Sequence, residues 1–304
     1  RVEVSIMNSS VSDGPVLVAV ANPARVEQLV RTAGDLARVG SGQVTVVSVV
    51  AKSRSSPVAL YSDETIIEQF AEETQSVVER ATGVVPADIS VDREIVVNRS
   101  VARGLLGVVD RTDPRALVVG WEIDPSRTNS ILGTNVDRLL KRAPCDVYVE
   151  RVGYEAGSVE SILLPVAGGP HVRPAAAAAK AIAARNDATV HVVSIAESGD
   201  GADRAREHLA DGVEKLEAAP GPDVETESAV MTDGETPDVI AQELKNHDIA
   251  VFGVTRRSSV RRRLLGSIPK EVAPRTDSPV IVARSGTVVE PSPFRRLRRL
   301  WRWA

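Results

Sequence analysis

The sequence predicts an α/β protein built from two tandem, doubly wound parallel-sheet domains of the Rossmann-like type. Two observations support this fold class. Apolar runs of strand length alternate with amphipathic segments of helix length along the chain, which is typical of a parallel sheet with helices on both faces. The same succession of segments occurs twice, so the chain contains an internal repeat.

The repeat is visible at two constant offsets. "VTVVSVV" at 44–50 resembles "VHVVSIA" at 190–196, which lies 146 positions later. "ALVVGW" at 116–121 resembles "IAVFGV" at 249–254, which lies 133 positions later. The second copy is therefore 13 residues shorter in its middle, and such a length change is typical of a crossover connection. We expect the two copies to form a pseudo-dimer of domains packed face to face.

Each copy is predicted to open with a buried strand and a helix. The strand lies in "PVLVAVANP" at 15–23 and in "SILLPVAGGP" at 161–170, and apolar residues then recur at helical spacing. Gly40 and Asn186 follow these helices at matching places. Both residue types tolerate the left-handed C′ position, so we expect Gly40 and Asn186 to end the two helices in that conformation.

The later elements complete the same layout in both copies. A second strand and a crossover helix lead to a third strand at "DREIVVN" (92–98) or "ETESAVM" (225–231). A helix, a fourth strand, a loop and a helix then lead to a last strand at "CDVYVER" (145–151) or "SPVIVAR" (278–284). The predicted boundaries are a lead at 1–13, a first domain at 14–151, a linker at 152–158, a second domain at 159–284 and a basic tail at 285–304.

Composition narrows the class of protein. A chain of 304 residues with 43% hydrophobic and 26% charged residues suits a soluble protein of two domains. No apolar run reaches the roughly 18 residues that a membrane-spanning helix needs. The single cysteine, Cys145, is expected to be a buried filler and fits the cytoplasm. The chain begins with Arg1 rather than Met, which is compatible with a piece of a longer polypeptide. Without its arginine-rich tail the body carries a net charge of about −9, which disfavours nucleic acid as a partner.

The fold predicts where a ligand would bind. In open α/β sheets ligands bind beyond the carboxyl ends of the strands, so the loops after the first and fourth strands of each copy should line the site. Glycines there let a backbone approach a ligand closely, helix starts attract anions, and a hydroxyl or guanidinium adds donors to phosphate. The candidate binding residues are Gly120, Gly133, Thr134, Gly168, Gly169, Gly253, Arg256, Gly266 and Ser267.

The last loop resembles the nucleotide-binding pattern G-x2-G-x9-G-[ST] of the universal stress protein family. Gly253 and Gly266 keep its outer spacing in the second copy, as Gly120 and Gly133 do in the first. The opening strands and helices also resemble the stress-protein domains fused behind amino-acid permeases and cation/proton antiporters. The resemblance covers nearly the whole chain. It implies tandem universal stress protein domains, with ATP or AMP as the ligand.

The chain departs from that family pattern at two places. ATP-binding members have an Asp at the end of the first strand that contacts adenine, whereas Asn22 and Gly168 stand at the matching places here. The middle glycine of the loop is replaced by Ile123 in the first copy and by Arg256 in the second. Two interpretations therefore remain open: the hydroxyls at the helix starts only cap their helices, or the second copy retains an anion or nucleotide site.

The other polar residues give weaker indications. Arg261, Arg262 and Arg263 either steer phosphate or an acidic partner, or form a solvated loop face. His171 lies near the expected ligand edge and is expected at the surface. We find no spacing typical of a metal site, no Ser-His-Asp arrangement and no Walker lysine. The chain is therefore predicted to bind without catalysing a reaction and to hold no metal.

The C-terminal tail has its own pattern. Phe294, Leu297, Leu300 and Trp301 fall at helical spacing, with arginines between them. A basic amphipathic segment of this kind can lie on an anionic membrane surface. A disordered tail and a contact with another subunit are the alternatives, because an isolated helix this short is marginal in water.

These features predict a cytoplasmic regulatory module rather than an enzyme. By the resemblance it would be the C-terminal part of a membrane transporter of the amino-acid permease type, with a degenerate nucleotide or anion site in its second domain. Its partners would be itself, as a pseudo-dimer or homodimer, and the membrane-embedded transporter domain. The alternatives are a free-standing ATP-binding stress protein with weak or no hydrolysis, and an interaction scaffold without a working site.

Overall fold

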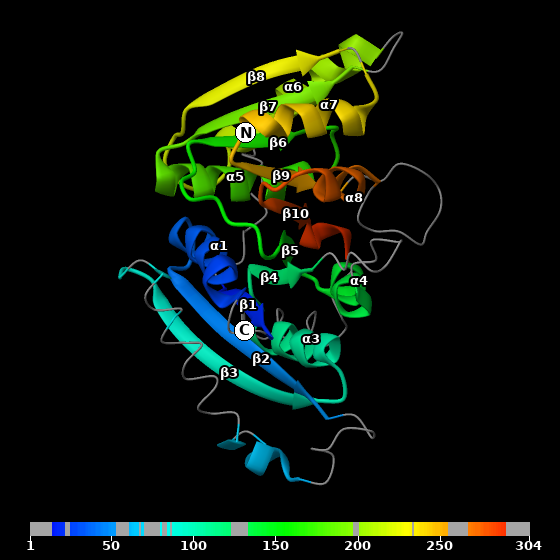
Figure 1. Cartoon of the computed structure of the whole chain (residues 1–304). Helices are drawn as coiled ribbons and strands as arrows, with labels where there is room; N and C mark the ends of the chain where they lie inside the picture. The colour runs from blue at the N-terminus through cyan, green and yellow to red at the C-terminus, as the bar shows by residue number, and fades with distance from the viewer. Residues whose placement is uncertain are drawn as a thin grey trace, which may run out of the picture.

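The computed structural model of the chain shows two similar halves, coloured blue to green and green to red in Figure 1. The residues that the structure describes are 14–21, 25–52, 61–66, 68–69, 80, 84–85, 87–122, 133–196, 201–232, 234–254 and 267–289. The features predicted for Asn22, Ile123, Arg256, Arg261, Arg262, Arg263, Gly266, Phe294, Leu297, Leu300 and Trp301 lie outside these residues.

The described strands form one sheet in the order β3-β2-β1-β4-β5-β10-β9-β6-β7-β8. The strands of the first half are β1 (Val16–Val20), β2 (Gln43–Ala51), β3 (Ser90–Asn98), β4 (Ala116–Trp121) and β5 (Asp146–Arg151). Those of the second half are β6 (Ser161–Pro165), β7 (Thr189–Ile195), β8 (Thr226–Met231), β9 (Ile249–Gly253) and β10 (Val280–Arg284). Neighbouring strands within each half pair in parallel, as the alternation of strands and helices predicts.

Helices cover both faces of this sheet. The first half has α1 (Val26–Arg38), α3 (Val101–Thr112) and α4 (Gly133–Arg142). The second half has α5 (Val172–Asn186), α6 (Gly201–Glu217), α7 (Thr236–Glu243) with η3 (Leu244–Asn246), α8 (Ser267–Val272) with η4 (Ala273–Arg275), and η5 (Gly286–Val288). Apolar residues of α1, α5 and α6 pack on one face, while those of α3, α4, α7 and α8 pack on the other. The predicted α/β class with two doubly wound halves is confirmed.

The two halves join through the edges of their sheets, so the expected face-to-face packing of the two domains is wrong. β5 and β10, the last strand of each half, pair antiparallel and merge the two sheets into one. Each half already carries helices on both faces, and this leaves the strand edge as the surface with unpaired backbone groups. α1 and α5 lie side by side next to this pair, as Figure 1 shows. We call β5, β10, α1 and α5 the junction.

Strand registers repeat between the halves, which explains the constant offsets in the sequence. Val16 pairs with Val44 in the first half, and Ile162 pairs with Val190 in the second. Ile162 lies 146 positions after Val16, and Val190 lies 146 positions after Val44. The pairing of the first strand with the fourth strand also repeats between the halves. Below, the counterpart of a residue is the one 146 positions later before the crossover, or 133 positions later from the fourth strand onward.

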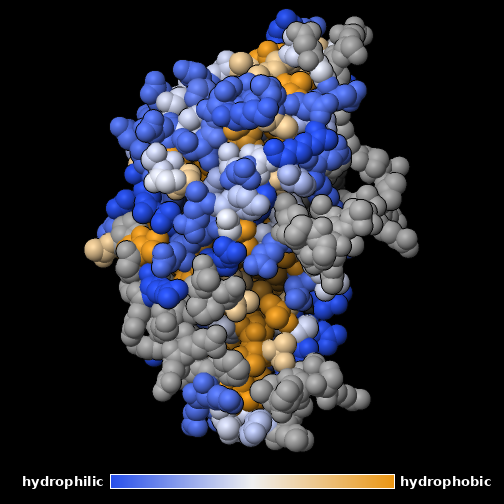
Figure 2. All heavy atoms as spheres, viewed as in Figure 1, coloured by the Kyte–Doolittle hydropathy of each residue, from blue (hydrophilic) through white to orange (hydrophobic). Residues whose placement is uncertain are grey.

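The surfaces of the halves differ in the view of Figure 2. Hydrophilic side chains cover most of the second half, whereas hydrophobic side chains show between the elements of the first half. Tyr61 is nevertheless the one large hydrophobic side chain among the described residues that is strongly exposed. Most apolar residues of both halves are thus used in the two core layers.

The predicted helix ends are wrong in detail. Asn186 is the last residue of α5, and Asp187 takes the left-handed conformation with φ of 55°. After α1 the left-handed residue is Gly42, with φ of 65°, and not Gly40. A Cβ at Gly40 would lie 1.2 Å from Nη1 of Arg115, so this glycine makes room for a side chain rather than for a turn.

Candidate ligand site

A cavity of about 420 Å³ opens at the carboxyl ends of β6, β7 and β9. This is the place where chain order reverses across the second half of the sheet, and where α/β sheets bind ligands. The first turns of α5, α6, α7 and α8 surround it. Its lining residues are Pro165, Val166, Ala167, Gly168, Gly169, Pro170, His171, Ser194, Ile195, Gly201, Arg204, Ala205, His208, Thr236, Ile240, Phe252, Gly253, Val254, Ile268 and Pro269.

Gly168 and Gly169 form the turn between β6 and α5, and both line the cavity as the sequence predicts for this edge. Both have left-handed backbones, with φ of 72° and 85°. A Cβ at Gly168 would lie 2.8 Å from Cδ2 of His208, whereas a Cβ at Gly169 would meet nothing within 4 Å. Gly168 therefore makes room for an imidazole, while the open side of Gly169 leaves backbone accessible.

Gly253 ends β9 at the floor of the cavity and touches the start of α5. A Cβ at Gly253 would lie 2.9 Å from the carbonyl oxygen of His171, so the strand and the helix start approach each other through bare backbone. His171 itself is 4% exposed, and its Nδ1 accepts a hydrogen bond of 3.0 Å from the Ser285 amide. The expectation of a surface histidine is wrong, because the end of β10 covers this residue.

The charged side chains that line the cavity are basic. Arg204 and His208 lie one turn apart on α6, and neither makes a hydrogen bond or ion pair with any described residue. No Asp or Glu is among the described lining residues. The N-terminal turns of α5, α6 and α7 add the partial positive charge of a helix start. The cavity therefore suits an anionic ligand of small-molecule size.

Arg204 and His208 did not emerge from the sequence analysis. No motif marks them, and α6 as a whole is rich in acidic residues. The available signal was their i, i+4 spacing, which puts both on one helix face just after the second strand.

The remaining candidate residues are placed unevenly. Ser267 is the first residue of α8, and its neighbours Ile268 and Pro269 line the cavity together with Gly253. Gly168, Gly169 and Gly253 thus meet at one cavity, and Ser267 directly precedes two of its lining residues.

The first-half candidates lie in different surroundings. A Cβ at Gly120 would lie 2.9 Å from Cγ1 of Val152 and 3.3 Å from Cδ1 of Leu29. Gly133 begins α4 with φ of 54°, and the exposed Thr134 makes no hydrogen bond with described residues. Gly120 is thus packed against core side chains, whereas the start of α4 is open to solvent.

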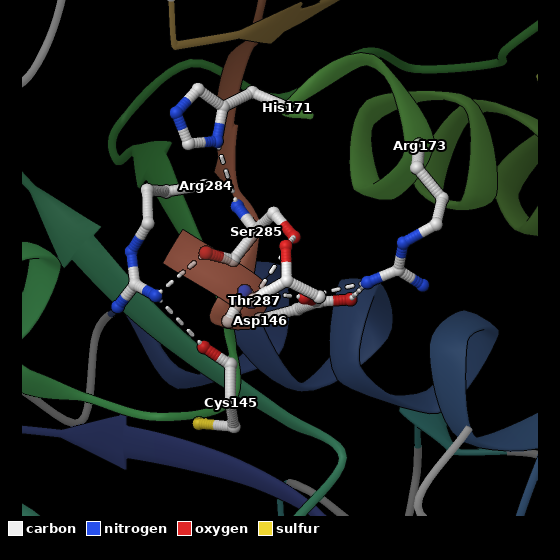
Figure 3. Close-up of polar contacts among 8 residues, drawn as sticks. Cys145, Asp146, His171, Arg173, Arg284, Ser285 and Thr287 are labelled. Carbon is white, nitrogen blue, oxygen red and sulfur yellow. Dashed lines mark hydrogen bonds and ion pairs between the residues drawn. The ribbon is translucent and has the colours of Figure 1, made fainter. Parts of the chain in front are cut away.

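A polar cluster connects the wall of the cavity to the first half, as Figure 3 shows. Asp146 of β5 receives both 3.0 Å hydrogen bonds of Arg173 from α5, and one of 2.8 Å from the Gly286 amide. Arg284 donates to the carbonyl oxygens of Cys145 and Ser285 at 3.2 and 2.9 Å. Since the Ser285 amide also binds His171, these contacts reach from the cavity to β5.

Two buried carboxyl groups lie beside the junction. Gln28 donates to Oε1 of Glu150 at 2.8 Å, while Oε2 of Glu150 is buried without a hydrogen-bond partner. Asp35 pairs with Arg185 of α5 across the junction at 3.0 Å. Burial raises the pKa of Glu150 and the pKa of Asp35 to about 7, against the hydrogen bonds of Thr32 and Gln28 and the charge of Arg185. Both groups change charge near neutral pH.

A Ser-His-Glu arrangement lies at the opposite edge of the sheet, although the sequence analysis found none. Ser161 hydrogen bonds to Nδ1 of His247, whose Nε2 lies 3.3 Å from Glu243. The Ser161 amide is bound to the Asp248 carboxylate at 3.0 Å, and burial lowers the pKa of His247. Ser161 is the first residue of β6, and the other three residues precede β9, so the cluster lies at the amino ends of these strands, away from the cavity, and ties η3 to the first strand of the second half.

The fold and the cavity define a class: a tandem α/β protein whose second half has a cavity at the carboxyl ends of its strands. A family model fixes the assignment further. The universal stress protein family matches residues 14–151 and 158–284, and the chain belongs to this family. No curated protein matches the chain by sequence.

Solved structures share the fold at low sequence identity. A universal stress protein from Archaeoglobus fulgidus DSM 4304 is 17% identical with a TM-score of 0.64, covering 92% of this chain and 99% of that one. The cytoplasmic domain of a prokaryotic cation chloride cotransporter is 11% identical with a TM-score of 0.54, covering 93% and 99%. A shorter universal stress protein solved in complex with cAMP is 23% identical with a TM-score of 0.33, covering 41% and 97%.

Two further properties concern the described residues alone. None of their helices combines the length and the apolar character needed to cross a membrane. Their His, Cys, Asp and Glu side chains form no group of three or more that is placed to hold a metal ion.

Proposed function

We propose that the chain is a regulatory module whose second half binds a phosphorylated nucleotide, ATP or AMP, without turning it over. The observation that carries this proposal is the cavity at the ends of β6, β7 and β9. It combines the N-terminal turns of α5, α6 and α7 with Arg204 and His208, and its described lining includes no acidic side chain. A phosphate group would meet positive charge there and little repulsion.

The cavity can be divided by chemistry. Arg204 and His208 form the basic side, whereas Ile195, Ile240 and Phe252 form an apolar side. A base could lie against the apolar side while phosphates face the basic one.

We further propose that this module is the cytosolic C-terminal part of a transporter of the amino-acid permease type. The structural likeness to the cytoplasmic domain of a cation chloride cotransporter, which this chain matches over nearly its full length, supports that role. The free-standing stress protein from Archaeoglobus fulgidus supports the alternative of an independent nucleotide-binding protein. A reading frame that continues upstream of the Arg1 codon into many hydrophobic spans would favour the transporter, and a start codon there would contradict it.

Calorimetric titration with ATP, AMP, adenosine and pyrophosphate tests the binding proposal. We expect AMP or ATP to bind and Arg204→Ala to weaken that binding about tenfold, the cost of one charge-assisted hydrogen bond. Arg206→Ala is the matched control. Arg206 lies on the same helix, is exposed and pairs with Asp203 at 2.6 Å, so its loss should leave affinity unchanged.

Three results would contradict the proposal. The wild type could show no heat with any nucleotide at high concentration, which would favour a scaffold. Arg204→Ala and Arg206→Ala could weaken binding equally, which would place the ligand elsewhere. Steady phosphate release from ATP would contradict binding without turnover.

A further inference from the structure

Two arginines occupy counterpart positions at the ends of the junction strands. Arg151 ends β5 and Arg284 ends β10, and their exposed fractions are 4% and 1%. Neither makes an ion pair with a described carboxylate. Each guanidinium instead donates to main-chain carbonyls of the opposite half, and the Nε of each is buried without a hydrogen-bond partner.

The carbonyls that they bind are counterparts as well. Nη2 of Arg284 donates to Ala143 at 2.7 Å, just after α4 of the first half. Nη1 of Arg151 donates to Thr276 at 2.5 Å, just after α8 and η4 of the second half. Thr276 lies 133 positions after Ala143, the same offset that separates the two arginines. The halves therefore exchange one arginine each.

Antiparallel pairing of β5 with β10 explains this exchange. Arg284 pairs with Val147, so the end of one strand lies beside the start of the other. At each start the chain has just left the last helix of that half. Carbonyls at a helix end lack intrahelical partners and carry partial negative charge, which suits a buried cation.

The two contacts differ in strength. Arg284 also binds the carbonyl oxygens of Leu139 and Cys145, both at 3.2 Å. Arg151 donates to one described carbonyl oxygen, that of Thr276, and its guanidinium also contacts Tyr154, lying 3.5 Å from the centre of the ring. Arg151 thus gives the end of α8–η4 one hydrogen bond from the first half, beside the ion pair of Arg275 with Asp238 of α7, whereas Arg284 gives the end of α4 several bonds.

We propose that Arg151 is a positioning residue for the cavity of the second half, acting from the first half through α8 and η4. Its bond to Thr276 fixes the far end of the segment whose beginning carries Ile268 and Pro269 into the cavity wall. Arg284 holds α4 in the equivalent manner. This inference rests on the proposed function, in which the cavity is the ligand site, and makes ligand affinity sensitive to the junction.

Hydrogen exchange and AMP titration of the full chain test the proposal with four variants. Arg151→Met should raise amide exchange at residues 267–276 about tenfold and weaken AMP binding by a similar factor. Arg151→Lys should restore most of both, since an ammonium group can still donate to Thr276. Arg284→Met should raise exchange in α4 and leave α8 unchanged.

Arg185→Met is the matched control, because it tests whether the loss of any arginine contact across the junction has the same effect. Arg185 also crosses the junction, to Asp35, but it touches neither helix end. Its loss should lower overall stability while exchange at 267–276 and AMP affinity stay as in the wild type. Equal effects of Arg151→Met and Arg185→Met would overturn the proposal.

The two proposals fail in different ways. If the wild type does not bind AMP, the proposed function fails, and exchange at 267–276 still tests the positioning by Arg151. Unchanged exchange there in Arg151→Met overturns the positioning role, whatever AMP does. If Arg151→Met does not fold, Arg151→Lys decides the question. We then expect amide exchange at 267–276 in Arg151→Lys to stay close to that of the wild type, while Arg284→Met shows faster exchange in α4. Exchange raised throughout Arg151→Lys would overturn the role.

Discussion

The fourth strands of the two halves show how one backbone serves two purposes. Gly120 and Gly253 are counterparts in matching registers. Gly120 faces the side chains of Val152 and Leu29, so it belongs to the packing of the core. Gly253 faces the backbone at the start of α5 and lines the cavity. A shared motif glycine therefore indicates a shared fold but not a shared site.

The junction shows a second difference between the halves. The first half contributes buried polar residues, namely Gln28, Thr32, Asp35 and Glu150. Their counterparts in the second half are Pro174, Ala178, Ala181 and Ala283. The small side chains of α5 let α1 approach closely, and Asp35 of α1 pairs with Arg185 of α5. The two junction carboxyl groups whose pKa is raised, Asp35 and Glu150, thus both come from the first half.

The largest expected effect is a difference in stability and AMP binding between substitutions of Gly253 and Gly120. In Gly253→Ala the new Cβ would lie 2.9 Å from the His171 carbonyl oxygen, and a helix start cannot move as a side chain can. We expect the free energy of unfolding to fall by about 3 kcal/mol and AMP binding to be lost. Gly120→Ala, which meets side chains, should cost about 1 kcal/mol and leave AMP binding intact. Urea unfolding and calorimetry measure both.

Equal losses of stability in the two variants would contradict this comparison. So would a Gly253→Ala protein that binds AMP as the wild type does, because the close approach of β9 to α5 would then have no bearing on the cavity.

A smaller effect should appear as a dependence of stability on pH. The pKa of Glu150 is about 7 in the folded chain, against 4.5 as its ordinary value. A raised carboxyl pKa means that the folded state holds the proton more tightly, so the contribution of Glu150 to stability is fully present below pH 4.5 and is lost as the pH rises through about 7. Glu150→Gln should raise the free energy of unfolding at pH 8 by on the order of 2 kcal/mol and change it little at pH 5.

Asp35 remains in that variant, so part of the pH dependence should persist. Glu27→Gln is the control, because Glu27 is exposed on α1 and its replacement should alter neither the value nor the slope. An unchanged slope between pH 5 and 8 in Glu150→Gln would show that this carboxyl does not titrate as its burial implies.

Sequence patterns were sufficient for the parts of the fold that depend on local order. The offsets of 146 and 133 residues predicted that the two halves repeat the same layout, and strand–helix alternation predicted parallel pairing and the ligand edge. Gly168, Gly169 and Gly253 were predicted at that edge from their places after β6 and β9, and they line one cavity. These features follow from residues close to one another in the chain.

The features that the sequence did not predict depend on distant pairs. His171 is buried because Ser285, 114 positions later, covers it. The antiparallel join of β5 and β10 has no local signal, because either strand reads as an ordinary buried strand. The role of Arg151 could not be predicted for the same reason, since its acceptor Thr276 lies 125 positions away. Arg256 and Gly266 stay predictions, because they lie outside the described residues.

The smallest expected change in stability concerns α3, a helix whose glycine content differs from that of its counterpart in the second half. α3 contains two glycines, whereas α7 of the second half contains none. A Cβ at Gly104 would lie 2.6 Å from Cγ1 of Val49, so Gly104 allows α3 to lie close to β2. A Cβ at the exposed Gly107 would meet nothing within 4 Å.

Gly107→Ala should therefore stabilise the chain by about 0.5–1 kcal/mol, because alanine favours the helix and nothing obstructs it. Gly104→Ala, the matched variant one turn earlier, should destabilise it by about 1 kcal/mol, since Val49 would have to move. Urea midpoints that shift in opposite directions would show that α3 retains glycine for packing at one position only. A loss of stability in Gly107→Ala would mean instead that both glycines serve the packing of the first half.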